Sequence, residues 1–396
     1  MNPGLAALQP YPFQRLGQLF KGISAANLPE IALTIGEPQH APPQVVIEAL
    51  TQALGEISHY PSTTGSASLR ASIARWIERR FELPRIDADA QVLPVNGTRE
   101  ALFAIAQTLV TPGEPGRVMS PNPFYQIYEG AALLAGTNPT FVPADSCNKF
   151  KPDFSNVTAD DWAQLELLYI CNPGNPSGAV MAEAELRALI TLAQEHDFVI
   201  VSDECYSEIY PDEQAPPTGL LSAAANMGLH DFTRCLCFHS LSKRSNLPGL
   251  RSGFVAGDAD IIKKFTQYRT YHGCAMPPHH QIASSVAWSD ETHVVANRAA
   301  YRAKFEAVVP ILSAQLDVTT PDAGFYLWPK TPFDDLEFAC ELLKRCNVAV
   351  LPGQFLGRTV NGENPGENRI RMALVTDQET CVEAAQRIVQ ALEQGW

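Results

Sequence analysis

The sequence predicts an α/β protein with a mostly parallel sheet in a large domain and a smaller α+β domain. Between about residues 92 and 257, short apolar runs alternate with helical patterns, which is typical of strands covered by helices. After about residue 285 the pattern changes to longer helices with isolated strands. The chain has 396 residues, of which 45% are hydrophobic, so it can bury the core that two domains need.

The apolar runs of the large domain are its predicted strands. They are residues 92–95, 167–170, 198–201, 235–238 and 254–256. Leu186 begins an apolar series at i, i+3, i+4 and i+7 that ends at Ala193, which predicts a one-faced helix between two of these strands.

The later part of the chain predicts three separate strands, at 325–328, 348–351 and 370–374. A final helix should begin after Thr376, where Thr376 and Glu379 have the spacing of a capping box. We expect three regions. They are an N-terminal arm at 1–40 that contributes to the small domain, a large domain at 41–285 and a small C-terminal domain at 286–396.

Composition excludes several classes of protein. The formal charge of -14 and the pI near 5.1 argue against a nucleic-acid surface, which needs a basic face. The N-terminus lacks the pattern of a signal peptide and no run of eighteen apolar residues occurs, so a cytoplasmic protein without a membrane segment is expected. The nine cysteines lack metal-ligand spacing and are interpreted as buried thiols, so no metal site is expected.

A lysine, an arginine and two serines stand close together at 240–253, where the chain reads SLSKRSNLPGLRSG. Pyridoxal 5'-phosphate is an aldehyde on a pyridine ring with a phosphate tail, so its site needs an amine, an acid and phosphate donors. Lys243 follows a predicted strand, three residues after Ser240 and eight before Arg251. One loop can therefore offer the amine and phosphate ligands together, and we expect Lys243 to carry the Schiff base. Without this context Lys243 would be a surface lysine.

Asp203 and Tyr206 belong to the tetrapeptide DECY, directly after a predicted strand. Ligands bind at the carboxyl ends of parallel strands, where a carboxylate can pair with the pyridine nitrogen and keep it protonated. Tyr206 can donate a hydrogen bond to the phenolate oxygen of the ring. The alternatives are a helix cap for Asp203 and a place in the core for Tyr206.

Two turns offer further ligands. The stretch 172–178 reads NPGNPSG after an apolar strand, and Asn175 is the expected second donor to the phenolate, although an ordinary turn has the same chemistry. Residues 96–99 precede the helical run 100–107, so the free N–H groups at that helix start can cradle a phosphate.

Other candidates are an aromatic residue and two arginines. Tyr125 offers a face for the pyridine ring, and core packing is the alternative. Arg369 and Arg371 share one face of a predicted strand, so alternation cannot decide which of them binds a substrate carboxylate. A surface ion pair is the alternative for both.

The chain resembles the fold-type I pyridoxal-phosphate enzymes of the class I/II aminotransferase family from about residue 30 onward. The motifs that carry the likeness, in order, are Gly36, Tyr60-x4-Gly65-x3-Leu69-Arg70, Gly97-Thr98-Arg99, Tyr125, Asn175-Pro176, Asp203-x-x-Tyr206, Ser240-x-Ser242-Lys243, Arg251 and Arg371. Each motif is modest, but the complete set in one order is highly specific.

This resemblance implies a role for each matched residue. Lys243 is then the catalytic lysine, and Arg371, not Arg369, binds the substrate carboxylate, with Gly36 and Asn175 beside it. The cofactor-binding set is Tyr60, Gly97, Thr98, Arg99, Tyr125, Asn175, Asp203, Tyr206, Ser240, Ser242, Lys243 and Arg251. Tyr60 should reach the phosphate of a neighbouring subunit, which implies a homodimer with shared active sites.

A narrower resemblance concerns the substrate. The SLSKRSNLPGLRSGF run and the early YPFQRL are similar to the N-succinyl-L,L-diaminopimelate aminotransferases of bacterial lysine synthesis. The reaction this implies transfers an amino group to 2-oxoglutarate and gives N-succinyl-2-amino-6-oxopimelate and glutamate. The alternatives are an aspartate, aromatic or acetylornithine aminotransferase, a carbon-sulfur lyase, or a cofactor-sensing regulator.

The distal end of such a substrate has no ligand in the motifs. Candidates from the sequence are Arg15, Asn246 and the loop 271–280. The adjacent His279 and His280 are interpreted as loop surface rather than ligands or bases.

Overall fold

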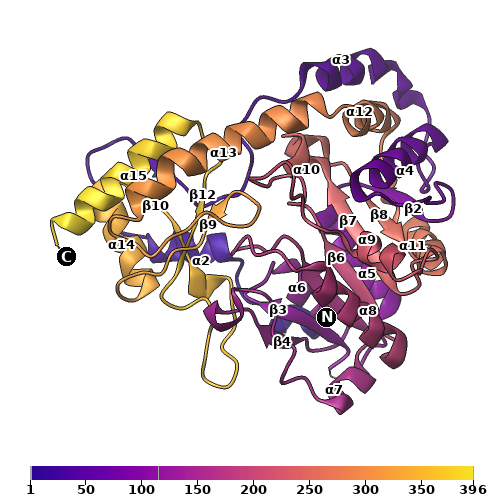
Figure 1. The fold of residues 1–396 in the computed structure, drawn as a ribbon, viewed down its shortest axis with the longest axis horizontal. Helices are drawn as coiled ribbons and strands as arrows, with labels where there is room; N and C mark the ends of the chain where they lie inside the picture. The colour runs from indigo at the N-terminus through magenta and orange to yellow at the C-terminus, as the bar shows by residue number, and fades with distance from the viewer. Residues whose placement is uncertain (1, 115, 396) are drawn as a thin grey trace.

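The computed structural model describes residues 2–114 and 116–395, and its centre is a seven-stranded sheet (Figure 1). In sheet order the strands are β2 (Val92–Val95), β8 (Gly253–Gly257), β7 (Cys235–Ser240), β6 (Val199–Asp203), β5 (Leu167–Cys171), β3 (Val118–Asn122) and β4 (Thr140–Pro143). Strand β8 runs antiparallel to both of its neighbours, and the other pairs are parallel. The predicted mostly parallel sheet is therefore confirmed.

Two hydrophobic clusters cover the two faces of this sheet. One cluster joins α5 (Thr98–Leu109), α6 (Ile127–Leu134) and α11 (Ala259–His272) to strand residues such as Leu93 and Val201. The other joins α4 (Ala67–Phe81), α8 (Glu183–His196), α9 (Leu220–Asn226) and α12 (Pro278–Ser289) to alternate strand residues such as Ile200. Because both faces are covered, the central strands β6, β7 and β8 are buried along their whole length, as parallel strands usually are.

The C-terminal region has two smaller sheets. Strands β11 (Leu351–Pro352), β12 (Ile370–Ala373) and β9 (Tyr326–Leu327) form an antiparallel sheet, and β1 (Ile31–Ala32) pairs in parallel with β10 (Val348–Ala349). Helices α13 (Thr292–Leu312), α14 (Asp335–Cys346) and α15 (Gln378–Glu393) supply most of the cluster around them. Through β1 the N-terminal segment joins this region, while the domain limits at 40 and 285 stay predictions.

The remaining elements are short. They are α1 (Gly4–Ala7), α2 (Pro12–Leu19), α3 (Gln44–Gln52), α7 (Ala159–Gln164), α10 (Leu241–Arg244) and the 3-10 turns η1 (Ala53–Ser58), η2 (Ser146–Asn148), η3 (Pro248–Leu250) and η4 (Gly353–Phe355). No helix of the described residues is both long and apolar enough to cross a membrane.

Two expectations about local structure were wrong. The final helix has no capping box at Thr376, because Asp377 is its N-cap and accepts a hydrogen bond from the backbone N–H of Thr380 at 2.8 Å. A carboxylate one residue later satisfies the same free donors better than the threonine. The predicted strand 348–351 is two strands in different sheets, because β10 pairs with β1 and β11 pairs with β12.

Candidate active site

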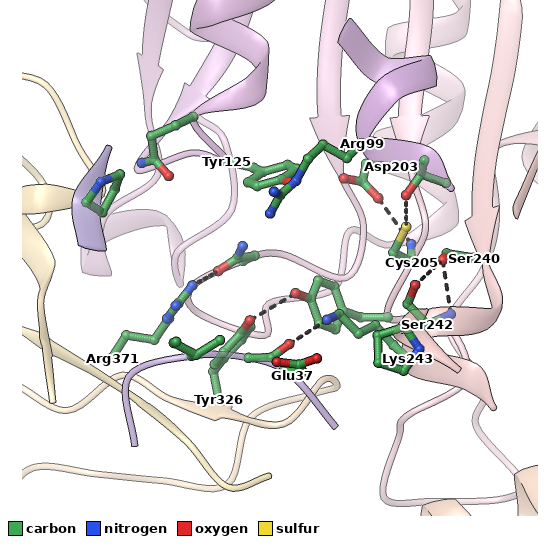
Figure 2. A pocket seen from close by; sticks show the side chains of 18 of the residues that line it. Glu37, Arg99, Tyr125, Asp203, Cys205, Ser240, Ser242, Lys243, Tyr326 and Arg371 are labelled. Carbon is green, nitrogen blue, oxygen red and sulfur yellow. Dashed lines mark hydrogen bonds between the residues drawn. The ribbon is translucent and has the colours of Figure 1, made fainter. Parts of the chain in front are cut away.

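A cavity of about 520 Å³ lies where β6 and β7 end, and most of the predicted site residues line it. They are Gly36, Thr98, Arg99, Tyr125, Asn175, Asp203, Tyr206, Ser240, Ser242, Lys243, Arg251 and Arg371. Figure 2 shows Arg99, Tyr125, Asp203, Lys243 and Arg371 around the same space. Its size suits a cofactor together with part of a substrate.

Lys243 reaches this cavity from α10, the single turn of helix that follows β7. Its Nζ donates a hydrogen bond to the backbone oxygen of Gly36 at 2.5 Å. Burial lowers the pKa of Lys243 to about 8, and the positive charge of Arg371 acts in the same direction. An amine with this pKa reaches its neutral form near neutral pH far more readily than an ordinary lysine does, and the neutral amine is the nucleophile and base that Schiff-base chemistry needs.

Asp203 is the last residue of β6 and its carboxylate is buried at the cavity wall. The hydroxyl of Tyr128 donates to its Oδ2 at 2.8 Å, and the backbone N–H of Cys205 donates to its Oδ1 at 3.2 Å. Burial raises its pKa, so a cationic partner such as a protonated ring nitrogen would stabilise the ionised form. Because its Oδ1 accepts from the backbone N–H of Cys205, Asp203 also caps a turn. Its carboxylate can act both as this cap and as the partner of a ring nitrogen.

The two arginines that the sequence left open have different surroundings. Arg371 lines the cavity, where its guanidinium donates to Asn175 Oδ1 at 3.0 Å and to the backbone oxygen of Thr34 at 2.9 Å. Arg369 does not line the cavity, since it donates to the backbone oxygen of Trp328 and its guanidinium lies 4.5 Å from the ring centre of Phe150. Of the two, Arg371 is the one placed to meet a ligand.

The start of α5 forms one wall of the cavity. Gly97 is the N-cap with φ +83, and a Cβ added there would lie 2.3 Å from Nη2 of Arg251. Two serines also line the cavity, and the hydroxyl of Ser240 donates to the hydroxyl of Ser242 at 2.9 Å. Free backbone N–H groups at the helix start, two hydroxyls and a guanidinium are the donors that a phosphate needs.

Arg99 and Tyr125 lie on the same side of the cavity. The Nε of Arg99 donates to the hydroxyl of Tyr125 at 2.6 Å, and burial raises the pKa of that phenol. Within residues 2–114 and 116–395, the guanidinium of Arg99 has no carboxylate within salt-bridge distance.

Several cavity residues were missed by the sequence reasoning. They are Tyr11, Glu37, Cys205 and Tyr326, all of which line the cavity, and Tyr128 behind Asp203. Cys205 lies inside the DECY motif, so its neighbours offered a signal. Tyr326 is in an apolar strand run, where nothing separates a cavity tyrosine from a core tyrosine.

Other candidates lie outside the cavity. Tyr60 is fully exposed and does not line it, which leaves its predicted contact with a partner subunit untested. Arg15 lies over the ring of Phe355 at 4.0 Å, and Asn246 donates to Asn297, so neither faces the cavity. No residue of the loop 271–280 lines it either.

One group outside the cavity has metal-ligating atoms. The ligand atoms of Glu100, His272 and Cys274 lie within 4.8 Å of one another. Arg269 already donates to both carboxylate oxygens of Glu100, at 2.9 and 2.8 Å, so this carboxylate has its counter-charge in the protein. The expectation of no metal site stays a prediction.

The cavity residues fit pyridoxal phosphate as a set. Lys243 supplies an amine of lowered pKa, and Asp203 supplies a buried carboxylate. Gly97, which has no side chain, leaves the start of α5 open next to the guanidinium of Arg251. Three arginines of the cavity wall, Arg99, Arg251 and Arg371, have no carboxylate partner in the described part of the chain. These free charges suit the phosphate and the carboxylates of an amino-acid substrate.

Comparison with known proteins identifies an aminotransferase family. The profile of the family "Aminotransferase class I and II" matches residues 29–388. The LL-diaminopimelate aminotransferase of Maridesulfovibrio salexigens is 30% identical over 97% of both chains. An aminotransferase structure from Neisseria meningitidis is 48% identical with a TM-score of 0.95, covering 98% of this chain and 99% of that one.

A further solved structure resembles the chain over nearly its whole length. A probable N-succinyldiaminopimelate aminotransferase from Thermus thermophilus is 25% identical with a TM-score of 0.84, covering 96% of this chain and 100% of that one. Together with the match over nearly the whole chain, these likenesses confirm the predicted family and its fold. The chain belongs to the class I and II aminotransferases and is a pyridoxal-phosphate-dependent enzyme.

Proposed function

We propose that this aminotransferase transfers the free α-amino group of N-succinyl-L,L-diaminopimelate to 2-oxoglutarate, giving N-succinyl-2-amino-6-oxopimelate and glutamate. The motif resemblance and the Thermus thermophilus neighbour support this choice. It implies a role in the cytoplasmic synthesis of diaminopimelate and lysine.

The observation that carries the proposal is the number of free guanidinium groups in the cavity wall. Arg251 faces the predicted phosphate cradle and Arg371 is placed for an α-carboxylate. Arg99 is left over, and beyond its one bond to Tyr125 its guanidinium has free donors at the cavity. A third free cation suits a substrate with a second anionic end, and both N-succinyl-L,L-diaminopimelate and 2-oxoglutarate have one.

The chain's own residues have distinct tasks in this reaction. Pyridoxal phosphate, when bound, would supply the group that withdraws electrons from the substrate Cα, and Asp203 would keep its ring nitrogen protonated. Asn175 and Tyr206 hold the ring oxygen. Lys243, as a neutral amine, takes the proton from Cα and returns it, and Arg371 holds the α-carboxylate in place, which favours loss of the proton over loss of the carboxylate.

A second candidate substrate is L,L-diaminopimelate itself, because relatives that are 30% identical over the whole chain have this name. Its distal end carries an ammonium group instead of a succinyl arm. The exposed carboxylate of Glu37 at the cavity wall favours such a cation. Arg99 and Glu37 therefore favour different substrates.

The test is a substrate panel under one set of conditions. We expect the highest kcat/KM for N-succinyl-L,L-diaminopimelate, because the remote arm contributes binding energy that smaller substrates lack. L,L-diaminopimelate, acetylornithine, aspartate and phenylalanine should all be poorer. A clear preference for one of these four would reject the proposed substrate, and keto-acid release without 2-oxoglutarate would indicate a lyase.

We further propose a homodimer with shared active sites. Tyr60 is fully exposed, and Leu54 and Ile57 in the preceding turn η1 are exposed apolar residues that a partner subunit would cover. Mixed dimers of Tyr60→Phe with Lys243→Ala test the idea. Activity above that of the two parent proteins supports sharing, and no gain in verified mixed dimers contradicts it.

A further inference from the structure

Tyr326 connects three predicted site residues, although no motif includes it. It lies in β9, only 3% of the residue's surface is exposed, and it lines the cavity. Its hydroxyl lies 3.0 Å from the hydroxyl of Tyr206. Figure 2 shows Tyr326 between Arg371 and Lys243, with its hydroxyl toward the interior of the cavity.

The contact with Tyr206 has a preferred direction once a ligand is present. A phenol has one proton to donate, so Tyr206 can donate to the ring oxygen of the cofactor only if it accepts from Tyr326. Burial raises the pKa of Tyr206, which keeps its proton in place as a donor. The chain of donors then runs from Tyr326 through Tyr206 to the ring oxygen.

The ring of Tyr326 has a second contact. The guanidinium of Arg371 lies 4.4 Å from its centre, at the distance of a cation–π interaction. The same guanidinium donates hydrogen bonds to Asn175 and to the backbone oxygen of Thr34, so the ring adds a third contact to a side chain that is already held at two points.

Tyr326 also explains a glycine. A Cβ on Gly36 would lie 1.9 Å from the hydroxyl oxygen of Tyr326, so no other residue fits at position 36 while Tyr326 stays in place. Gly36 accepts the hydrogen bond of Lys243 through its backbone oxygen. The position of Tyr326 is therefore linked to the backbone that meets the catalytic lysine.

We propose that Tyr326 is a positioning residue of the active site: its hydroxyl orients Tyr206 toward the cofactor ring oxygen, and its ring supports Arg371. This inference rests on the roles proposed above for Tyr206 and Arg371. It assigns the two parts of one side chain to two separable effects.

The hydroxyl is tested with Tyr326→Phe, read by the pH midpoint at which the visible absorption band of the holoenzyme changes. Loss of a donor makes the ring oxygen more basic, so the midpoint should rise by about 0.5–1 unit. Tyr206→Phe should raise it by more, and the double variant should match Tyr206→Phe alone because the effect of Tyr326 passes through Tyr206.

Tyr301→Phe is the matched control. Tyr301 is similarly buried and packs against Phe325. Its hydroxyl has no hydrogen-bond partner among residues 2–114 and 116–395, and it does not line the cavity. Removal of the Tyr301 hydroxyl should leave the pH midpoint of the absorption change as it is in the wild type. If the midpoint shifts in Tyr206→Phe but not in Tyr326→Phe, the role proposed for Tyr326 is wrong and that of Tyr206 stands. If the midpoint does not shift in Tyr206→Phe, the proposed role of Tyr206 is itself rejected.

The ring is tested with Tyr326→Leu against Tyr326→Phe. Only the leucine variant lacks the aromatic face, so it should weaken binding of maleate, a dicarboxylate probe, by about 3–10-fold while the phenylalanine variant binds as the wild type does. Equal binding of maleate by all three proteins would overturn the role of the ring.

Discussion

Four arginines of the described residues are almost completely buried, and they fall into two groups. Arg244, Arg269 and Arg298 are each within 3.0 Å of a carboxylate oxygen, on Glu291, Glu100 and Glu213 respectively. Arg371 is 4% exposed, and in the same part of the chain only neutral oxygens accept its hydrogen bonds. The first three are packed into the framework of the protein, and the fourth faces the cavity.

This difference has a physical meaning. Burying a charge without a counter-charge is costly, and a protein normally supplies a carboxylate. At Arg371 the counter-charge is left for a ligand to supply. The same holds in a weaker form for Arg99 and Arg251, which are exposed to the cavity and therefore less costly. Free cations inside a chain of formal charge -14 mark the place where anions bind.

The largest expected effect concerns the amine of the cavity. Lys243→Ala should fold but lose at least about 10⁴-fold in transamination, because both the covalent attachment and the proton transfer depend on this amine. Single-turnover assays measure the loss. Borohydride reduction of the wild type followed by peptide mapping should place the cofactor on Lys243, and a label on another lysine would reject the assignment.

The next prediction separates the two groups of arginines. Arg371→Leu should lower kcat/KM by about 10²–10³-fold with little change in the free energy of unfolding, because no carboxylate is left unpaired. Arg298→Leu leaves Glu213 without three hydrogen bonds and should cost about 3 kcal/mol of stability while kcat/KM changes little. Urea unfolding and steady-state kinetics on both variants check this. Similar profiles for the two variants would remove the distinction.

A smaller effect should appear in the pH dependence of stability of the cofactor-free protein. The pKa of Lys243 is lowered from 10.5 to about 8 by burial, so the unfolded chain binds more protons between these pH values and wild-type stability rises with pH there. Lys243→Met lacks this cost and should be more stable than the wild type by about 1–3 kcal/mol at pH 7. The advantage should shrink from pH 8 toward 10.5 in urea unfolding. A difference independent of pH would contradict the lowered pKa.

The sequence predicted the framework of this site because its signals are local. Asp203 ends one buried strand and Lys243 follows another, and parallel strands bring their carboxyl ends together whatever the rest of the chain does. Strands β3 and β4 were missed, since polar residues such as Ser120, Asn122 and Thr140 interrupt their apolar runs in addition to Pro121 and Pro143.

The contacts between distant segments could not be predicted. The choice between Arg369 and Arg371 depends on which neighbour each side chain meets, and alternation places both on one face. Tyr326 reaches Tyr206 across 120 residues, and the free state of Arg99 depends on which carboxylates fold close to it. Partners of this kind are set by tertiary packing.

The most direct test of the central claim is the ratio of kcat/KM for N-succinyl-L,L-diaminopimelate to that for L,L-diaminopimelate, in the wild type and in Arg99→Gln. If the free guanidinium of Arg99 binds the distal anionic end, the wild-type ratio is well above one and falls by about 10–100-fold in the variant, the loss of one charge-assisted contact. The value for L,L-diaminopimelate itself should change little. A wild-type ratio below one, or a ratio that Arg99→Gln leaves unchanged, would contradict the account.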